Sequence, residues 1–244
     1  MAEKTMLEVQ NVSKRFGGLL ALNQLDFTVS ENEVLGLIGP NGSGKTTMIN
    51  LISGALKPSS GDIFLGDRLI SDKPIRGIAR AGVARTFQLV RILPSLSVLE
   101  NVMAGAVFGH KRLWGLEASK YAARLLNRVG MGHAIHMPTT ALTYIDEKRV
   151  ELARALASDP KLLLLDEWLA GLNPTELTIG IDLVKSLRDE GRTIIVVEHV
   201  MDAIRSLCDR CVVMSSGEKI AEGTPGEVLA NREVIRAYLG DDHA

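Results

Sequence analysis

The sequence has few cysteines, no excess of either charge and no long uninterrupted apolar run. Its two cysteines, Cys208 and Cys211, form a single C-x-x-C pair in 244 residues. Because no second pair completes a zinc site, we expect both to be small buried residues between a helix and a strand. No stretch approaches the roughly 18 apolar residues of a membrane span, and the first ten residues include charges without an apolar segment. Neither a membrane span nor a signal peptide is expected.

The charge balance gives no reason to expect a polyanionic partner. Lysine and arginine number 28 against 29 aspartate and glutamate residues, for a formal net charge of -1. Nucleic acids and anionic membrane surfaces usually select proteins with a marked positive excess. Apolar residues make up 46% of the chain, enough to bury a full core. We therefore expect an ordinary globular protein, organised as one domain with an inserted lobe.

A glycine-rich loop follows the apolar run Val34–Ile38 and has the pattern G-x-x-x-x-G-K-T. Its glycines let backbone N–H groups converge on one anion, which an ordinary strand-to-helix turn does not require. Lys45 can reach terminal phosphates and the Thr46 hydroxyl can bind Mg²⁺, so the loop predicts nucleotide binding. The candidate nucleotide-binding residues are Gly39, Pro40, Asn41, Gly42, Ser43, Gly44, Lys45, Thr46 and Thr47.

A second candidate site follows the sequence LLLLDE, residues 162–167. If this apolar run is a buried parallel strand, its two carboxylates lie at the edge where such sheets bind ligands. Asp166 would then hold the Mg²⁺ water shell while Glu167 faces the γ-phosphate. Such a pair could merely cap a helix, but the phosphate loop favours catalysis. His199, after the apolar run Thr193–Val197, is predicted at the same edge, although a lone histidine is often structural.

The order of the predicted elements indicates an α/β fold. Half-buried strands are expected at residues 7–12 and 25–29, a hairpin at 61–70, and helical periodicity throughout 88–158. Elsewhere we predict strands at 34–38, 83–87, 161–165, 193–197 and 211–214, and helices at 45–53, 176–189 and 201–207. This alternation implies a parallel sheet covered by helices. The predicted parts are a core with a β subdomain (1–87 and 159–222), a helical subdomain (88–158) and a C-terminal tail of two short helices (223–244).

Taken together, these motifs resemble the ATPase subunits of ABC transporters over nearly the whole chain. RTFQ ends in Gln88 at the family's Q-loop, AGLNP resembles the D-loop, and His199 occupies the place of the switch histidine. Phe16 matches the aromatic residue that stacks on adenine, although core packing would also explain that residue alone. The stretches VSKRFGGLLAL, ARTFQ, LSVLENVMAGA and EVIRAYLG are most similar to the ATPases of branched-chain amino acid importers.

The resemblance implies a P-loop NTPase (RecA-like) core with an antiparallel β subdomain and an inserted helical subdomain. It implies ATP and Mg²⁺ as cofactors, with Thr46, Gln88 and Asp166 toward the metal and Glu167, His199 and Gln88 in catalysis. The expected partners are a second ABC ATPase subunit, itself or a paralogue, integral-membrane permease subunits and, indirectly, a substrate-binding protein, but no nucleic acid. The chain would bind the cytoplasmic face of the membrane and power import of branched-chain or other hydrophobic amino acids.

The family signature, usually Leu-Ser-Gly-Gly-Gln, is replaced by LTYID. The signature candidates, which act on the partner's nucleotide, are Thr143, Tyr144, Ile145 and Asp146. Ile145 replaces a glycine whose backbone approaches the γ-phosphate, and Asp146 either adds negative charge there or caps a helix that begins at residue 147. Trp168 stands where the family usually has proline. Ile145 and Trp168 leave open one alternative, a nucleotide-binding subunit with weak hydrolysis. A second alternative, independent of these departures, is a soluble ABC ATPase of an assembly or repair complex without a membrane partner.

Overall fold

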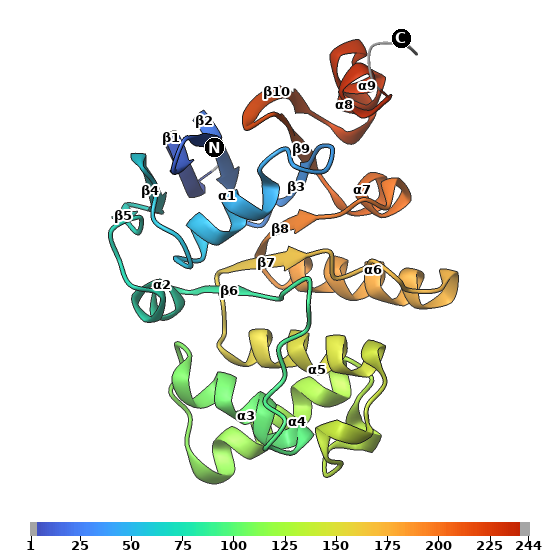
Figure 1. Ribbon diagram of the computed structural model, residues 1–244. Coiled ribbons are helices and arrows are strands. Elements are labelled where there is room, and N and C mark those ends of the chain that lie inside the picture. Colours follow the sequence, from blue (N-terminus) through green and yellow to red (C-terminus); the bar gives the residue numbers. More distant parts are fainter. Residues whose placement is uncertain (1–3, 240–244) are drawn as a thin grey trace. The chain divides into compact units, whose positions relative to one another are not determined.

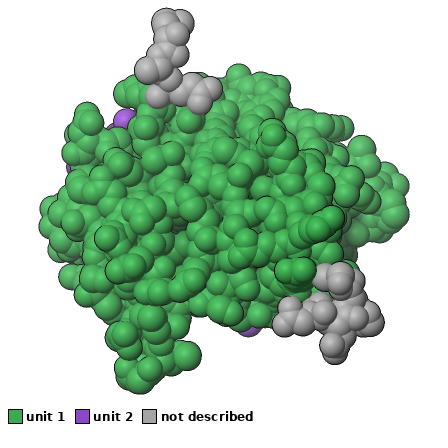
Figure 2. Space-filling view, turned by 90° about the horizontal axis from the view of Figure 1, so that it is seen from above, with its two compact units in different colours: residues 1–78, 169–244 green, residues 79–168 purple. Residues whose placement is uncertain are grey.

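A computed structural model describes residues 4–239 of the chain. It contains two compact units, residues 1–78 with 169–244 and residues 79–168, which are coloured separately in Figure 2. The second unit extends beyond the helical segment 88–158, because it also contains the strand on either side of those helices, β6 (Val83–Arg85) and β7 (Leu162–Asp166).

An antiparallel sheet opens the first unit. Its strands lie in the order β2-β1-β4-β5, and they are β1 (Thr5–Phe16), β2 (Leu19–Ser30), β4 (Ser60–Leu65) and β5 (Arg68–Leu69). The predicted hairpin is confirmed, with Gly66 at φ 54° in the turn between β4 and β5. Both β1 and β2 continue past their predicted ends, and shifts in their pairing register accommodate this length. The antiparallel β subdomain is therefore as expected.

A second sheet of the first unit has the order β10-β9-β3-β8 and is mostly parallel. Its strands are β3 (Val34–Ile38), β8 (Thr193–Val197), β9 (Arg210–Ser215) and β10 (Glu218–Gly223). Every residue of β3 and β8 is buried, as their continuous apolar sequences predict. The edge strand β10, which pairs antiparallel with β9, was not predicted because its sequence EKIAEG is largely polar and partly exposed.

Residues at the helix ends determine where the helices of the first unit begin. They are α1 (Lys45–Ile52), α6 (Pro174–Asp189), α7 (Met201–Leu207), α8 (Pro225–Ala230) and α9 (Arg232–Leu239), while α2 (Ile75–Ala81) continues into the second unit. The predicted start of α6 at residue 176 was two residues late, because Asn173 caps the helix and proline suits its first position. The two predicted tail helices are α8 and α9, and residues 240–244 lie outside the described part.

Three helices form the interior of the second unit and pack against one another, drawn from green to yellow in Figure 1. They are α3 (Val98–Phe108), α4 (Gly115–Arg128) and α5 (Tyr144–Ala157), with short 3₁₀ turns at Gly132–Ala134 and Thr139–Ala141. Close approach of α3 to α5 requires Gly105, since a Cβ there would lie 2.2 Å from the carbonyl oxygen of Arg154. The strands β6 and β7 pair in parallel within the same unit.

The cysteines are buried at the junction of α7 and β9, as the sequence predicts. Cys208 is 8% exposed and Cys211 is fully buried. A Cβ on Gly36 of β3 would lie only 2.9 Å from the sulfur of Cys211 and 3.0 Å from that of Cys208. Glycine in the middle of β3 therefore makes room for the two thiols.

Candidate functional site

The phosphate loop joins β3 to α1 in the first unit (Figure 1). Gly39 and Gly44 adopt φ angles of 147° and 103°, which side chains rarely permit. Space is also limited, because a Cβ on Gly39 would lie 2.0 Å from the carbonyl oxygen of Met214. A Cβ on Gly44 would lie 2.5 Å from Leu22. Conformation and packing both explain glycine at these two positions.

The Lys45 ammonium group is held inside this loop. It donates hydrogen bonds to the carbonyl oxygens of Gly39 at 2.7 Å and Pro40 at 2.9 Å, and the side chain is buried. Because α1 begins at Lys45, the positive end of the helix dipole also faces the loop. A fixed cation and a helix amino terminus together suit a phosphate group. The remaining loop side chains range from buried Ser43 to exposed Asn41 and Thr46.

His199 and Phe16 lie in the same unit as the loop. Strands β3 and β8 pair in parallel, so the loop after β3 and His199 after β8 share one sheet edge. His199 is exposed there, as expected for a residue that meets a ligand. The Phe16 ring is 45% exposed at the end of β1, which removes core packing as its explanation. Lys14 lies 5.2 Å from the centre of that ring.

The predicted metal-binding Asp166 and the predicted catalytic Glu167 lie in the second unit at the end of β7. Asp166 is buried and forms an ion pair with Arg85 of β6 at 3.2 Å. Gln88 donates from its side-chain nitrogen to a carboxylate oxygen of Glu167 at 2.8 Å. The structure therefore brings Gln88 and Glu167 together, as the resemblance implies. Burial lowers the pKa of Arg85, and the charge of Asp166 opposes that effect.

The segment around Gln88 is fixed by Glu151 of α5, which the sequence did not predict. Its two carboxylate oxygens accept hydrogen bonds from the backbone nitrogens of Phe87 at 3.0 Å and Arg91 at 2.8 Å. Burial raises the pKa of Glu151, and these two hydrogen bonds oppose the shift. The sequence does contain a signal for this role, because Glu151 is a charged residue among the apolar positions of α5.

The signature segment begins α5, and here one prediction was wrong. The helix starts at Tyr144 with Thr143 as its N-cap, so Asp146 lies in the first turn and does not cap a helix at residue 147. The Thr143 hydroxyl accepts a hydrogen bond from the Asp146 backbone nitrogen at 3.2 Å and donates one to its carboxylate at 2.7 Å. Thr143 is the cap because the N-cap residue directly precedes the helix and has an extended backbone, as Thr143 does. Arg149 lies 3.8 Å from the Asp146 carboxylate and offsets part of its charge.

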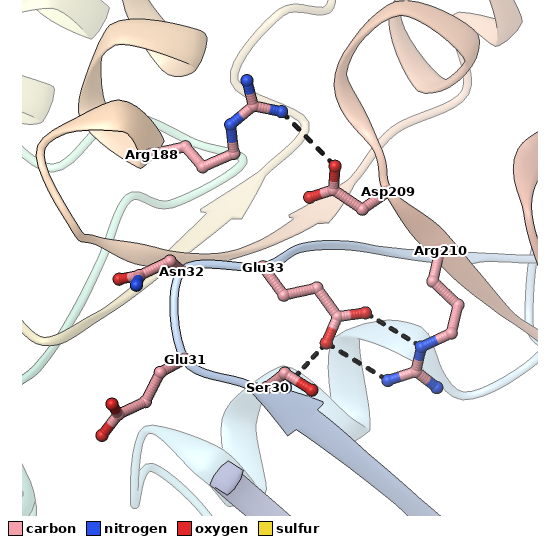
Figure 3. A pocket seen from close by; sticks show the side chains of 7 residues that line it. All are labelled: Ser30, Glu31, Asn32, Glu33, Arg188, Asp209 and Arg210. Carbon is pink, nitrogen blue, oxygen red and sulfur yellow. Dashed lines mark hydrogen bonds and ion pairs between the residues drawn. The ribbon is translucent and has the colours of Figure 1, made fainter. Parts of the chain in front are cut away.

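A separate pocket of about 470 Å³ lies near the start of β3 in the first unit (Figure 3). Both of its arginines are paired within it, since Arg210 pairs with Glu33 at 2.9 Å and Arg188 pairs with Asp209 at 3.4 Å. The pocket is at the amino end of β3, whereas the phosphate loop follows the carboxyl end. Ligands of such sheets bind at the carboxyl end, so this pocket belongs to the structural framework.

Comparison with known proteins identifies the family. Residues 22–170 match the family described as ABC transporter, which is more than half of the chain. The chain belongs to the ABC transporter family. It is an ATP-binding cassette, an ATPase that couples ATP hydrolysis to transport. Residues 218–244 also match a family described as branched-chain amino acid ATP-binding cassette transporter.

Several curated members of the ABC transporter family match over nearly their full length. The high-affinity branched-chain amino acid transport ATP-binding protein LivG of Salmonella typhimurium is 40% identical, covering 97% of this chain and 98% of LivG. BraF of Pseudomonas aeruginosa, with the same description, is 38% identical over 98% of this chain and 99% of BraF. The lipopolysaccharide export system ATP-binding protein LptB of Escherichia coli is 34% identical, covering 97% of this chain and 98% of LptB.

Solved ABC cassettes share the fold. A nucleotide-free ATP-binding cassette superposes with a TM-score of 0.87 at 30% identity, covering 97% of this chain and all of that one. A dimeric cassette in a post-hydrolysis state with ADP and phosphate superposes with a TM-score of 0.83 at 27% identity. The match covers 90% of this chain and 99% of that one. The predicted fold class is thereby confirmed. Within residues 4–239, no helix is both long and apolar enough to cross a membrane.

Proposed function

We propose that this ABC ATPase powers the import of branched-chain or other hydrophobic amino acids. The observation that carries the proposal is the match of residues 218–244 to the branched-chain amino acid cassettes, since that match lies outside the general ABC region. The identity of 38–40% to LivG and BraF over nearly the whole chain supports it. The amino acid itself would be bound by other subunits, so no residue of this chain reads the cargo.

The phosphate loop would bind the nucleotide. Lys45 would neutralise charge on the β- and γ-phosphates, backbone N–H groups of residues 39–47 would surround them, and Phe16 would stack on adenine. The side chains Thr46, Asp166 and Gln88 offer hydroxyl, carboxylate and amide oxygens. These are the hard ligands that Mg²⁺ prefers, so the donor chemistry of the three side chains suits that ion, and Asp166 forms an ion pair with Arg85 at 3.2 Å. The metal would add positive charge at the transferred phosphate.

Glu167 would orient or deprotonate the attacking water, with Gln88 and His199 responding to the γ-phosphate. The hydrogen bond from Gln88 to Glu167 supports this assignment, because it fixes a carboxylate oxygen directly after β7. A proton taken from water would pass to the Glu167 carboxylate. Neutralising that carboxylate as glutamine would therefore remove the acceptor and leave the geometry nearly unchanged.

The working unit would be a head-to-tail pair of ATPases, this chain with itself or with a paralogue, joined to integral-membrane permease subunits. A substrate-binding protein would deliver the cargo to the permease. A related cassette forms a dimer, which supports the first contact. The chain would then lie at the cytoplasmic face of the membrane. In such a pair the segment LTYID would face the partner's nucleotide. Ile145 would weaken both sites of a homodimer, or the partner's site alone in a pair with a paralogue that has an intact signature.

Uptake of labelled leucine, isoleucine and valine tests the proposal. Cells that lack the gene for this chain should lose high-affinity uptake, the wild-type chain should restore it, and Lys45→Ala should not. Uptake of an acidic amino acid serves as the control and should stay constant. Unchanged uptake of all three branched-chain amino acids would contradict the cargo. Purification without any integral-membrane protein would instead favour the soluble assembly or repair ATPase.

A further inference from the structure

Glu167 has an unusual backbone for a catalytic carboxylate. Its φ angle is 51°, in the left-handed region that residues with a side chain rarely adopt. Such a conformation persists only where surrounding contacts hold it, and it is often found at active sites. The hydrogen bond from Gln88 holds the carboxylate but not the backbone. Other contacts must therefore fix the peptide groups that follow β7.

Lys148 supplies such contacts from the first half of α5. Its ammonium group is buried and donates to the carbonyl oxygen of Glu167 at 3.2 Å and to that of Trp168 at 3.3 Å. A buried ammonium group is costly unless polar atoms surround it, so these carbonyl oxygens stabilise the charge while the charge holds the two peptide groups. Lys148 thus holds two consecutive peptide groups, the one between Glu167 and Trp168 and the one that follows Trp168.

Trp168 in turn forms a hydrogen bond to the backbone of Lys148. Its indole nitrogen donates to the carbonyl oxygen of Lys148 at 3.1 Å, and the side chain is 5% exposed. The large ring is buried, and its N–H fixes the lysine backbone. Proline, the usual residue of the family here, has no such donor. The exchange of hydrogen bonds between residues 148 and 168 therefore requires tryptophan in place of that proline.

We propose that Lys148 and Trp168 form a reciprocal clamp that positions Glu167 for ATP hydrolysis. Both are positioning residues, and the inference rests on the proposed role of Glu167. The clamp is also connected to the signature residues, because these residues form the start of α5. Lys148 lies 5.3 Å from the ring centre of Tyr144, whose hydroxyl donates to the carbonyl oxygen of Gln88 at 3.3 Å. The signature turn and the catalytic pair of one chain are thus held by one network.

Substitutions of the two clamp residues test the proposal in the assembled transporter. Lys148→Met removes the ammonium group but keeps the chain length, and should lower kcat about tenfold to a hundredfold, because small displacements of catalytic groups have effects of that size. Affinity for ATP should stay within about twofold, since the phosphate loop is untouched. Lys148→Arg should restore part of the lost rate. Trp168→Phe removes the N–H donor and replaces the indole by a smaller aromatic ring, and should lower kcat severalfold.

Matched controls separate positioning from general damage. Lys120→Met and Trp114→Phe make the same changes at exposed positions of the second unit and should leave kcat unchanged. The decisive comparison uses Glu167→Gln as the background. If Lys148 acts through Glu167, adding Lys148→Met to Glu167→Gln should cause little further loss in single-turnover rate. A structural defect would lower both backgrounds by the same factor.

The outcomes distinguish the clamp from the proposed function. Wild-type turnover in Glu167→Gln would overturn the catalytic assignment itself. An inactive Glu167→Gln together with wild-type turnover in Lys148→Met would overturn the clamp and leave the assignment standing. Equal losses from Lys148→Met in both backgrounds would also overturn it. Should Lys148→Met not fold, Trp168→Phe decides alone, because it retains an aromatic side chain and Lys148. Wild-type turnover in that variant counts against the clamp.

Discussion

The phosphate loop of the first unit and the acidic strand end of the second unit both have unusual backbone, but they maintain it differently. In the loop, glycines at 39, 42 and 44 adopt positive φ without a steric penalty. After β7, a glutamate adopts φ 51° and hydrogen bonds from distant residues hold it. A motif can be recognised from sequence where the backbone itself demands glycine. Where contacts maintain the geometry, sequence spacing carries little information.

The largest effect on ATP binding and turnover is expected from substitution of Lys45 in the phosphate loop. Lys45→Ala removes the fixed cation, so ATP affinity should fall and turnover should drop by at least about a hundredfold. The fold should survive, because the backbone contacts of the loop remain. Calorimetric titration with ATP checks the affinity and thermal unfolding checks the fold. Wild-type affinity would refute the assignment of the loop.

The second effect concerns the other side of the comparison. Glu167→Gln should keep ATP binding and lower turnover by about a hundredfold or more, since general-base catalysis contributes that much. A nucleotide-bound dimer should then accumulate and be visible by gel filtration with ATP. Unchanged turnover would show that another group activates water.

A third prediction compares two glycines of the loop. Gly42→Ala meets nothing within 4 Å and should lower the free energy of unfolding by only about 1 kcal/mol, from its φ of 78°. Gly39→Ala should cost clearly more, because its Cβ would lie 2.0 Å from a backbone oxygen and the loop must move. Urea unfolding measures both. Equal effects would mean that the loop is too plastic for packing to matter.

The smallest effect should come from the signature. Ile145→Gly opens room for the partner's γ-phosphate and should raise the ATPase rate of the homodimer up to about tenfold, equivalent to roughly 1.4 kcal/mol. Adding Asp146→Gln should help little, because Thr143 and Arg149 already engage that carboxylate. Steady-state rates and ATP-dependent dimerisation provide the measurement. A fast wild-type homodimer with no gain would show that LTYID is tolerated.

Local signals predicted much of the fold. The bounds of β3, β8 and α7 match their predictions, because apolar runs and flanking polar residues mark them directly. The strand β10 escaped prediction because a polar edge strand has no apolar pattern. The N-cap of α5 was misplaced because Thr143 and Asp146 are both good caps, and only the backbone decides between them.

The contacts around the acidic strand end were harder to foresee. Arg85 and Asp166 are 81 residues apart in the chain, and Glu151 lies 64 residues from the backbone nitrogen of Phe87. Such pairs depend on how β6, β7 and α5 come together, which no local periodicity specifies. The predicted roles of the site residues remain predictions, whereas the pairing of Gln88 with Glu167 is a feature of the structure.

The buried cysteines have a practical consequence. Both thiols of the chain lie in the first unit, against Gly36. A hydrogen bond to Cys211 and burial raise the pKa of Cys208, and both thiols are buried away from reagent. Alkylation must therefore await opening of the structure around α7 and β9. The rate of thiol labelling, measured by mass spectrometry, therefore reports how often this part of the first unit opens. The measurement needs no engineered probe, and it contains no signal from residues 79–168, which have no cysteine.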